Sequence, residues 1–189
     1  MDVIFPEGIG MANKMDKISI CDTYGNHLEK CLDASPTIIH NNVDEIKSSL
    51  GSLLNNENDH LSLLSSLYSK GIKQAFITDA EKPFYASNFD FHYKITLAKI
   101  DTIDSTGSGD AFTAGVIYGW HNKLNFEQQL RFASALGSCN AKSFEVCDVD
   151  IESAISASTS QTSKDFALQL PSAEANRSCC SKFNLLCHP

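Results

Sequence analysis

Residues 104–112 read DSTGSGDAF, and this stretch says more about the fold than any other part of the chain. Two glycines flank Ser108, Asp110 follows at once, and an apolar run begins directly behind it. Glycine allows positive φ angles and a close approach of the backbone to a ligand. When such a loop opens a helix, its unpaired amides and the helix dipole attract an anion. We therefore predict that the amides of 107–109 bind an anion at the start of a helix.

Asp110 is the unexpected residue of this loop, because a carboxylate repels the anion that the neighbouring amides attract. Its presence is explained if the carboxylate accepts a proton. A substrate hydroxyl beside the γ-phosphate of a nucleotide must lose its proton during phosphoryl transfer. The pattern therefore favours a phosphotransferase with Asp110 as the base. An alternative stays open on this stretch alone, in which Asp110 only begins a helix and the glycines only form a turn.

Two other glycine-rich motifs do not fit the chain. A P-loop needs a glycine followed by lysine and then serine or threonine, and the sequence has no such tripeptide. A dinucleotide-binding loop needs a third glycine where this chain has Phe112, and it follows the first strand of its sheet. A P-loop enzyme and a dehydrogenase-type cofactor domain are therefore disfavoured.

The composition narrows the class of protein further. The chain has 189 residues, with 15 lysines and arginines against 23 aspartates and glutamates, and a formal net charge of −8. An acidic chain without a basic run is not expected to bind nucleic acid. No apolar stretch is long enough to span a membrane, and the N-terminus lacks the pattern of a signal peptide. We expect a soluble, cytoplasmic protein without a nucleic-acid or membrane partner.

Short β-prone runs alternate with amphipathic stretches, which is typical of an α/β fold with a parallel sheet flanked by helices. The expected strands are 17–21, 36–40 and 73–78, with a hairpin from 84–86 and 91–100. The expected helices are 26–33, one capped by Asn41 or Asn42 with Glu45 in its first turn, one capped by Asp59, 110–121 and about 126–143.

Three polar segments follow predicted strands, and ligands of such sheets bind beyond the carboxyl ends of the strands. They are Asn41-Asn42, Thr78-Asp79 and the DSTGSGD loop, which comes after an apparent strand at 95–103. We expect these segments to converge on one rim of the sheet.

The folded part is predicted to be residues 1–158. Beyond it the sequence is rich in serine, polar and without sustained periodicity, which is typical of a disordered tail over 159–189.

The residues DSTGSGDAFTAG resemble the D-T-x-G-[AS]-G-D-x-F-x-x-G signature of the ribokinase (PfkB) family of carbohydrate kinases, with Ser105 as a departure. The segment from His40 to Ile46 resembles the family's K-P-N-x-x-E-L motif, and FEQQLRFASALGSCNAKSFE resembles its adenine-flanking helix. The resemblance covers roughly residues 3–156. The order and spacing of these motifs resemble those of the tagatose-6-phosphate kinases and 1-phosphofructokinases most.

The resemblance implies roles for the residues that match these motifs. Asp110 would be the catalytic base, and Gly107, Ser108 and Gly109 would form the anion hole. ATP would be bound by Thr78 and Ser134 together with Gly107, Gly109 and Asp110, and Mg²⁺ would be organised by Asn42 and Glu45, through water. For two of these residues a purely structural role is an open alternative: Asn42 could simply cap a helix, and Glu45 could simply interact with the helix dipole.

The chain also departs from the family. The family's T-x-G-x-x-G nucleotide loop is represented by residues 78–83, TDAEKP, without either glycine. The N-terminal VIFPEGI resembles the loop that precedes the second half of the family's fold. The resemblance thus implies a partial ribokinase-like fold in which the N-terminal strands, the sugar-binding glycines and the lid are missing.

Two hypotheses about function follow. The first is ATP-dependent phosphorylation of a hydroxyl on a sugar or sugar phosphate. The second is a truncated, catalytically silent nucleotide-binding or interaction module of the same family. The sequence does not specify the sugar, and it leaves open a homo-oligomer or a complementing subunit.

Overall fold

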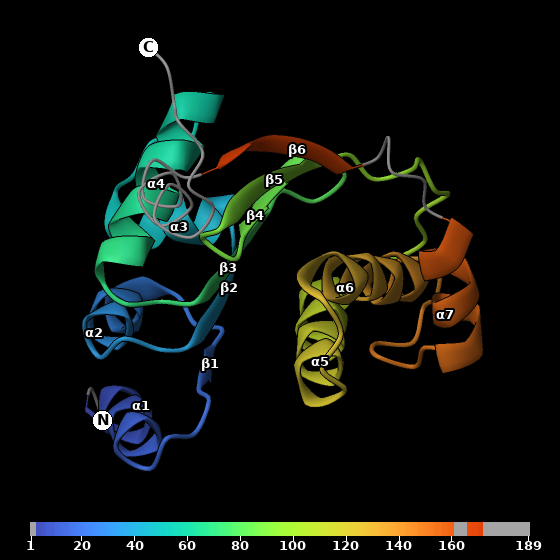
Figure 1. Cartoon of the computed structure of the whole chain (residues 1–189). Helices are drawn as coiled ribbons and strands as arrows, with labels where there is room; N and C mark the ends of the chain where they lie inside the picture. Colours follow the sequence, from blue (N-terminus) through green and yellow to red (C-terminus); the bar gives the residue numbers. More distant parts are fainter. Residues whose placement is uncertain (1–2, 161–165, 172–189) are drawn as a thin grey trace, which may run out of the picture. The chain divides into compact units, whose positions relative to one another are not determined.

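A computed structural model of the chain describes residues 3–160 and 166–171. The chain divides into two compact units. The first contains the chain up to Ile95 and again from Ala167, and the second runs from Thr96 to Phe166. Each unit is described by itself below, with the element labels of Figure 1.

The first unit contains a sheet with the strand order β1-β2-β3-β4-β5-β6. Its strands are β1 (Ile20–Cys21), β2 (Ile38–Asn42), β3 (Gln74–Thr78), β4 (Phe84–Ser87), β5 (Phe91–Ile95) and β6 (Phe166–Pro171). The first three strands are parallel, β4 is antiparallel to β3, and β4 and β5 form an antiparallel hairpin. In the register of β2 and β3, Asn42 pairs with Thr78. The predicted parallel sheet with an attached hairpin is therefore confirmed.

The helices of this unit are α1 (Ile4–Lys14), a 3₁₀ turn at Gly25–His27 that leads into α2 (Leu28–Asp33), α3 (Val43–Leu50) and α4 (Glu57–Ser69). Leu32, Ile46 and Leu64 bring α2, α3 and α4 into one buried cluster. Ile39 and Ala75 belong to the same cluster and come from β2 and β3, so these three helices cover one face of the sheet (Figure 1). Side chains alternate between the faces of a strand, so the next residue along β2, His40, lies on the opposite face.

Two details of this unit differ from the sequence-based expectation. Helix α4 begins after Asn56, whose side chain accepts from the amide of Asp59, so Asn56 is the cap and Asp59 is the third helical residue that bonds back to it. Asp59 was the wrong choice of cap because Asp and Asn both suit that position. Residues 4–14 form a helix where the sequence resembled a loop.

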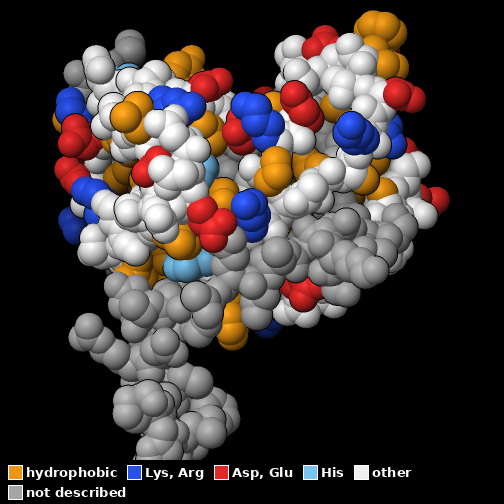
Figure 2. Space-filling model, turned by 90° about the horizontal axis from the view of Figure 1, so that it is seen from above, with side chains coloured by type: hydrophobic (Ala, Val, Ile, Leu, Met, Phe, Trp, Pro, Cys, Tyr) orange, Lys and Arg blue, Asp and Glu red, His pale blue; other side chains and the backbone are white. Residues whose placement is uncertain are grey.

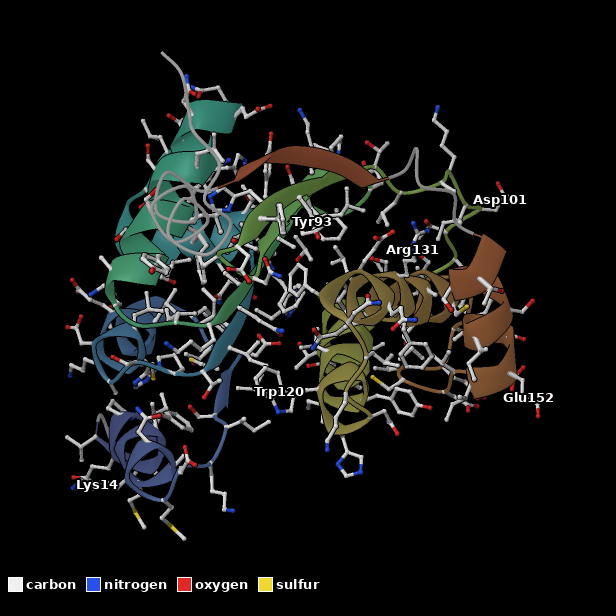
Figure 3. All side chains as sticks on the ribbon, in the orientation of Figure 1. Lys14, Tyr93, Asp101, Trp120, Arg131 and Glu152 are labelled. Carbon is white, nitrogen blue, oxygen red and sulfur yellow. The ribbon has the colours of Figure 1, made fainter. Side chains whose placement is uncertain are left out.

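The second unit consists of α5 (Ser108–His121), α6 (Phe126–Asn140) and α7 (Ile151–Ser160). Helices α5 and α6 approach closely because glycines on α5 face α6: a Cβ on Gly115 would lie 2.5 Å from the Cα of Ala133. Leu136 of α6 and Ala154 of α7 belong to one buried cluster, so α7 packs on α6. Figure 3 shows the side chains that project from these helices, among them Arg131, which forms an ion pair with Glu127 one turn earlier on α6.

Three expectations for this unit need correction. Helix α5 begins at Ser108, and α6 ends at Asn140. Residues 96–107 form no strand, because β5 ends at Ile95. Most side chains over 96–103 are exposed, so this segment has no buried face with which to join a sheet. The expected convergence of strand ends is therefore confirmed only for Asn42 and Thr78.

The segment predicted as a tail, 159–189, contains the end of α7 and strand β6. Its remaining residues, 161–165 and 172–189, lie outside the described residues. No helix within the described ranges is long and apolar enough to cross a membrane. On the face drawn in Figure 2, lysine and arginine side chains are interspersed with acidic ones.

Candidate active site

The loop before α5 takes its shape from Gly107. This residue is the N-cap of α5 and has φ 76° and ψ 0°, in the left-handed region that glycine adopts without strain. A side chain is also excluded here by space, because a Cβ would lie 2.3 Å from Cγ1 of Val146. Both the backbone conformation and the packing therefore require glycine at this position, as the sequence predicts.

Most amides of this loop have no acceptor among the described residues. Ser108 N–H donates to the carbonyl of Ser105 at 3.1 Å, and Ala111 N–H donates to the carbonyl of Gly107 at 2.9 Å. Within the described ranges, the amides of Gly107, Gly109 and Asp110 have no hydrogen-bond acceptor. Amides at a helix start with no acceptor in the chain attract an anion, and α5 adds its dipole. Three of the four amides over 107–110 are therefore available, while that of Ser108 is engaged.

Asn140 braces this loop and was missed by sequence reasoning. It is buried at the end of α6, and its Nδ2 donates to the carbonyl of Thr106 at 2.8 Å and to Oγ of Ser108 at 3.1 Å. Its Oδ1 accepts from the amide of Cys147 at 2.7 Å. One amide side chain therefore joins the loop before α5 to the segment after α6. In the sequence Asn140 was only one polar residue near the end of a predicted helix, so nothing local pointed to this role.

A second interaction within the loop fixes the turn that precedes Gly107. The amide of Thr106 donates to Oδ1 of Asp104 at 2.9 Å. The backbone amide and the side chain of Thr106 lower the pKa of the Asp104 carboxyl from its usual range. The partly exposed side chain of Asp104 thus holds the backbone of the turn in place through this hydrogen bond.

Asp110 and Ser134 differ in their surroundings. Asp110 lies in the first turn of α5 and is exposed, and its carboxylate has no hydrogen-bond or ion-pair partner among the described residues. Ser134 lies on α6 and is buried, with no partner for its Oγ within the same residues. The carboxylate of Asp110 is therefore available to interact with a ligand. A buried hydroxyl without a hydrogen bond destabilises the fold, so Ser134 Oγ needs a hydrogen-bond partner from outside the described residues.

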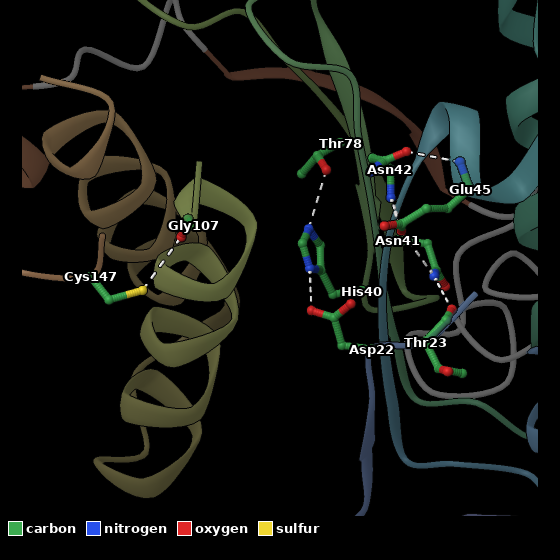
Figure 4. A network of polar contacts seen from close by, with 9 residues as sticks. All are labelled: Asp22, Thr23, His40, Asn41, Asn42, Glu45, Thr78, Gly107 and Cys147. Carbon is green, nitrogen blue, oxygen red and sulfur yellow. Dashed lines mark hydrogen bonds and ion pairs between the residues drawn. The ribbon is translucent and has the colours of Figure 1, made fainter. Parts of the chain in front are cut away.

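In the first unit, Asn42 and Glu45 form a reciprocal helix cap (Figure 4). Oδ1 of Asn42 accepts from the amide of Glu45 at 2.8 Å, and Oε2 of Glu45 accepts from the amide of Asn42 at 3.0 Å. The neighbouring Asn41 is fully buried, and its Nδ2 donates to the carbonyl of Thr23 at 2.7 Å and to Glu45 at 3.3 Å. Of the two candidates for the cap of this helix, Asn41 and Asn42, the structure selects Asn42, and the expected position of Glu45 in the first turn is confirmed.

This arrangement limits how the pair could act on a metal ion. Asn42 Oδ1 and Glu45 Oε2 already accept hydrogen bonds from the protein, whereas Oε1 of Glu45 has no partner among the described residues. No group of three or more histidine, cysteine or acidic side chains in the described part of the chain could enclose a metal ion. The residues therefore fit Mg²⁺ that keeps its own waters, with Oε1 accepting from one of them, and they do not fit direct enclosure of the ion.

A chain of three polar side chains crosses the ends of β1, β2 and β3 (Figure 4). Nδ1 of His40 lies 3.0 Å from Oδ2 of Asp22, and Nε2 of the same ring lies 3.2 Å from Oγ1 of Thr78. His40 is buried, with 4% of its surface exposed. The histidine therefore links a carboxylate to the threonine that the family resemblance places in the nucleotide loop. Sequence reasoning missed Asp22 and His40, because their contact depends on the pairing of strands that are distant in the chain.

The segment after Thr78 forms a tight turn. Ala80 has φ 47°, and the amide of Lys82 donates to the carbonyl of Asp79 at 2.8 Å. The side chain of Lys82 also reaches Asp79, at 3.3 Å. This turn reaches a left-handed conformation without a glycine.

Comparison with known proteins agrees with this description. Residues 7–153 match the model of the pfkB family of carbohydrate kinases. Because the match extends over most of the chain, the protein belongs to this family. The resemblance inferred from the DSTGSGDAFTAG motif is therefore confirmed.

Solved structures show the same ribokinase-like fold. Phosphofructokinase-2 from Escherichia coli, in complex with potassium, matches with a TM-score of 0.76 at 15% identity, over 82% of this chain and 51% of that chain. Ribokinase from Arabidopsis thaliana, with ribose and ATP, matches with a TM-score of 0.70 at 20% identity, over 85% and 54%. A 2-dehydro-3-deoxygluconokinase from Thermotoga maritima matches with a TM-score of 0.64 at 16% identity, over 84% and 55%. The chain spans about half the length of the structures it matches.

Proposed function

We propose that the protein takes part in the ATP-dependent phosphorylation of a hydroxyl group on a sugar or sugar phosphate. The observation that carries the proposal is the start of α5, where, within the described ranges, three amides have no acceptor and the exposed carboxylate of Asp110 has no partner. Membership of a carbohydrate kinase family supports this reading.

The chain's own groups would divide the work. The amides of Gly107, Gly109 and Asp110 would donate hydrogen bonds to the oxygens of the transferred phosphoryl group. Ser108, whose amide donates to the carbonyl of Ser105, would keep the backbone between these amides in place. The carboxylate of Asp110 would accept the proton of the acceptor hydroxyl, while the hydroxyl oxygen bonds to the γ-phosphorus and the bond to the departing ADP oxygen breaks. Asn140 would keep the loop in place.

The remaining predicted residues would serve the nucleotide. Thr78 and Ser134 each offer a hydroxyl, and Ser134 Oγ has no partner within the described residues. Asn42 and Glu45 would hold a water of hydrated Mg²⁺ through Oε1 of Glu45. Mg²⁺ bound with the nucleotide would neutralise charge on its phosphates.

A second candidate function is a nucleotide-binding or interaction module without catalysis. It is favoured by the 78–83 turn, which lacks the glycines of the family's nucleotide loop. Such a module would bind ATP through the same amides, and no phosphoryl transfer would follow. The two functions differ in turnover and not in binding.

The test combines both measurements on the full 189-residue chain. Calorimetry with ATP and Mg²⁺ measures binding, and a coupled assay measures ADP formation with a panel of hexoses and hexose phosphates. A kinase binds ATP and forms ADP only when a sugar is present, whereas a silent module binds ATP and forms none. A chain that does neither contradicts both functions.

Asp110→Asn tests the assigned base. General base catalysis contributes about 10²- to 10⁴-fold, so we expect turnover to fall by that factor while ATP affinity is retained. Asp101→Asn is the matched control, because Asp101 is also an exposed acid of the second unit but lies outside the loop (Figure 3). Equal turnover of Asp110→Asn and wild type would remove Asp110 from this role.

A further inference from the structure

Helix α1 is attached to the first unit by one side only (Figure 1). Ile9 is the one buried residue of this helix, and it belongs to the apolar cluster formed by α2, α3 and α4. On the same side of the helix, one turn later, Nδ2 of Asn13 donates to the carbonyls of Ala34 at 2.9 Å and Ser35 at 3.0 Å. The opposite side of α1 takes no part in the core of the described residues.

This opposite side is apolar. Successive residues of an α-helix are rotated by about 100°, so positions 4, 8, 11 and 15 form one row that faces away from Ile9. Within this row, Ile4, Met11 and Met15 are 62%, 62% and 64% exposed. A row of exposed apolar side chains along one side of a helix indicates a surface that another molecule covers.

Gly8 lies in the middle of the row, and nothing within the described chain requires a glycine there. It is not among the glycines with positive φ, and no other part of the chain lies within 4 Å of the position that a Cβ would take. A glycine inside a helix costs about 1 kcal/mol relative to alanine. That cost is offset if Gly8 leaves room for a molecule that packs closely on α1.

The charges of α1 point to a second copy of the same helix. Glu7 and Lys14 are its two charged residues, and they lie two turns apart on the same flank of the apolar row; Figure 3 labels Lys14. Neither forms an ion pair among the described residues. If two copies of α1 pack antiparallel about a twofold axis, Glu7 of each copy faces Lys14 of the other. A parallel pair would instead bring like charges together, so the pattern favours the antiparallel pair.

The apolar row fits the same arrangement. A twofold axis between positions 8 and 11 places Met11 of one copy on Gly8 of the other, and Ile4 of one copy near Met15 of the other. With a rise of about 1.5 Å per residue, the two oppositely charged residues are then offset by only about 3 Å along the helix axis. The flexible thioether of methionine can adapt to the space beside a glycine.

We propose that α1 is a self-association surface, through which two copies of this chain form an antiparallel dimer with Met11 of each copy packed on Gly8 of the other. A lipid surface is a less suitable partner, because α1 has one acid and one base and the chain has a net charge of −8, so neither attracts anionic lipids. One helix of 11 residues offers less than the ~800 Å² that each partner buries in a standard interface, so we expect a weak dimer. This inference does not depend on the proposed function.

Analytical ultracentrifugation of the full chain over a range of concentrations tests the surface. Wild type should change from monomer to dimer as the concentration rises. Met11→Gln should weaken the dimer about tenfold or more, because both copies lose an apolar contact. Leu53→Gln is the matched control, because Leu53 is 71% exposed but lies outside α1, and this variant should associate like wild type. Both side chains are exposed, so thermal unfolding of the two variants should match wild type.

Charge reversal tests the antiparallel arrangement. Glu7→Lys and Lys14→Glu should each weaken the dimer about two- to thirtyfold at low ionic strength, because the symmetric dimer loses two exposed ion pairs. An equal mixture of the two single variants should associate again, since lysines of one copy then face glutamates of the other. The double variant Glu7→Lys/Lys14→Glu should associate like wild type. Added salt should reduce the differences between these variants.

Four results would overturn the inference. The first is a chain that stays monomeric at every concentration, and the second is a dimer that Met11→Gln leaves unchanged or weakens no more than Leu53→Gln does. The third is a double variant that associates more weakly than both single variants, which would contradict the antiparallel pairing. The fourth is a monomer that binds vesicles of phosphatidylcholine and phosphatidylserine and loses this binding in Met11→Gln, which would assign the surface to a membrane. None of these results affects the proposed function, which ATP binding and turnover test separately.

Discussion

At the strand ends of the first unit, polar side chains form hydrogen bonds within the protein, whereas three backbone amides at the start of α5 in the second unit have no acceptor among the residues that the structure describes. In the first region Asn42, Glu45 and His40 each have side-chain partners within the described residues. In the second, Gly109 and Asp110 have none there. The two regions thus differ in what they offer: hydrogen bonds fix the side chains at the strand ends, and backbone donors at the helix start have no acceptor among the described residues.

The difference predicts which substitutions matter. At the helix start the backbone conformation and its packing are decisive, so changes at Gly107 or its support should have large effects. At the strand ends, the helix cap should contribute to the unfolding free energy about as much as any helix cap does. Substitutions there should change ligand affinity only where they remove a specific hydrogen-bonding atom.

Gly107→Ala should have the largest effect on stability. Alanine at φ 76° is strained, and its Cβ would collide with Val146, so we expect a loss of about 2–4 kcal/mol in the free energy of unfolding. Gly51→Ala is the matched control: Gly51 has φ 65° but no atom within 4 Å of the added Cβ, so it should lose about 1 kcal/mol. Chemical denaturation measures both. Equal losses would show that the packing of 146–147 on the loop contributes nothing.

Asn140→Ala should follow, because three loop groups lose their partner at a buried position. Leaving buried polar groups without hydrogen bonds costs about 1–3 kcal/mol each, partly recovered by water, so we expect a total loss of about 2–3 kcal/mol and weaker ATP binding. Asn122→Ala removes a single exposed bond to the carbonyl of Tyr118 and should change stability little. Unchanged ATP affinity in Asn140→Ala would show that the hydrogen bonds of Asn140 are not needed for ATP to bind at the proposed anion hole.

Asn42→Ala and Asn56→Ala remove the same kind of helix cap from α3 and α4. Each should lose about 1 kcal/mol of unfolding free energy. Only Asn42→Ala should also weaken the binding of ATP in the presence of Mg²⁺, because only this cap holds Glu45. If the two variants bind Mg²⁺ and ATP alike, the cap of α3 is purely structural.

The smallest effect concerns His60, which is buried and stacks on Tyr85 with ring centroids 4.2 Å apart. Desolvation lowers the pKa of His60 below its ordinary value of 6.5. The unfolded chain therefore binds more protons than the folded one once the pH falls below about 6.5, and the unfolding free energy decreases from there toward the lower folded pKa. Denaturation between pH 8 and pH 5 should show this decrease, and His60→Phe should flatten it. A decrease of the same size in His60→Phe would assign it to other groups.

The sequence predicted the parts of the site that depend on local chemistry. The conformation of the loop before α5 was predictable because Gly107 must adopt a positive φ, and the α3 cap because asparagine followed by glutamate three residues later is a local pattern. The start of α5 at Ser108 was missed by two positions, since Asp110 suits a helix start as well.

The rest depends on contacts between distant segments. Asp22 and His40 are 18 positions apart, and Asn140 and Thr106 are 34 apart. Residues so far apart in the sequence come into contact only through strand pairing or helix packing, which a local sequence pattern does not specify. The strand expected at 95–103 was wrong because an alternating pattern predicts a strand only where a buried face is available, and most side chains of 96–103 are exposed.

The most direct measurement of the central claim is a ¹H–¹⁵N NMR titration of the full chain with ATP and Mg²⁺. We expect the amide signals of Gly107, Gly109 and Asp110 to shift together and to saturate at the affinity found by calorimetry. Saturation with ATP that leaves these three signals in place, while signals elsewhere move, would show that the amides before and within the first turn of α5 do not hold the phosphate.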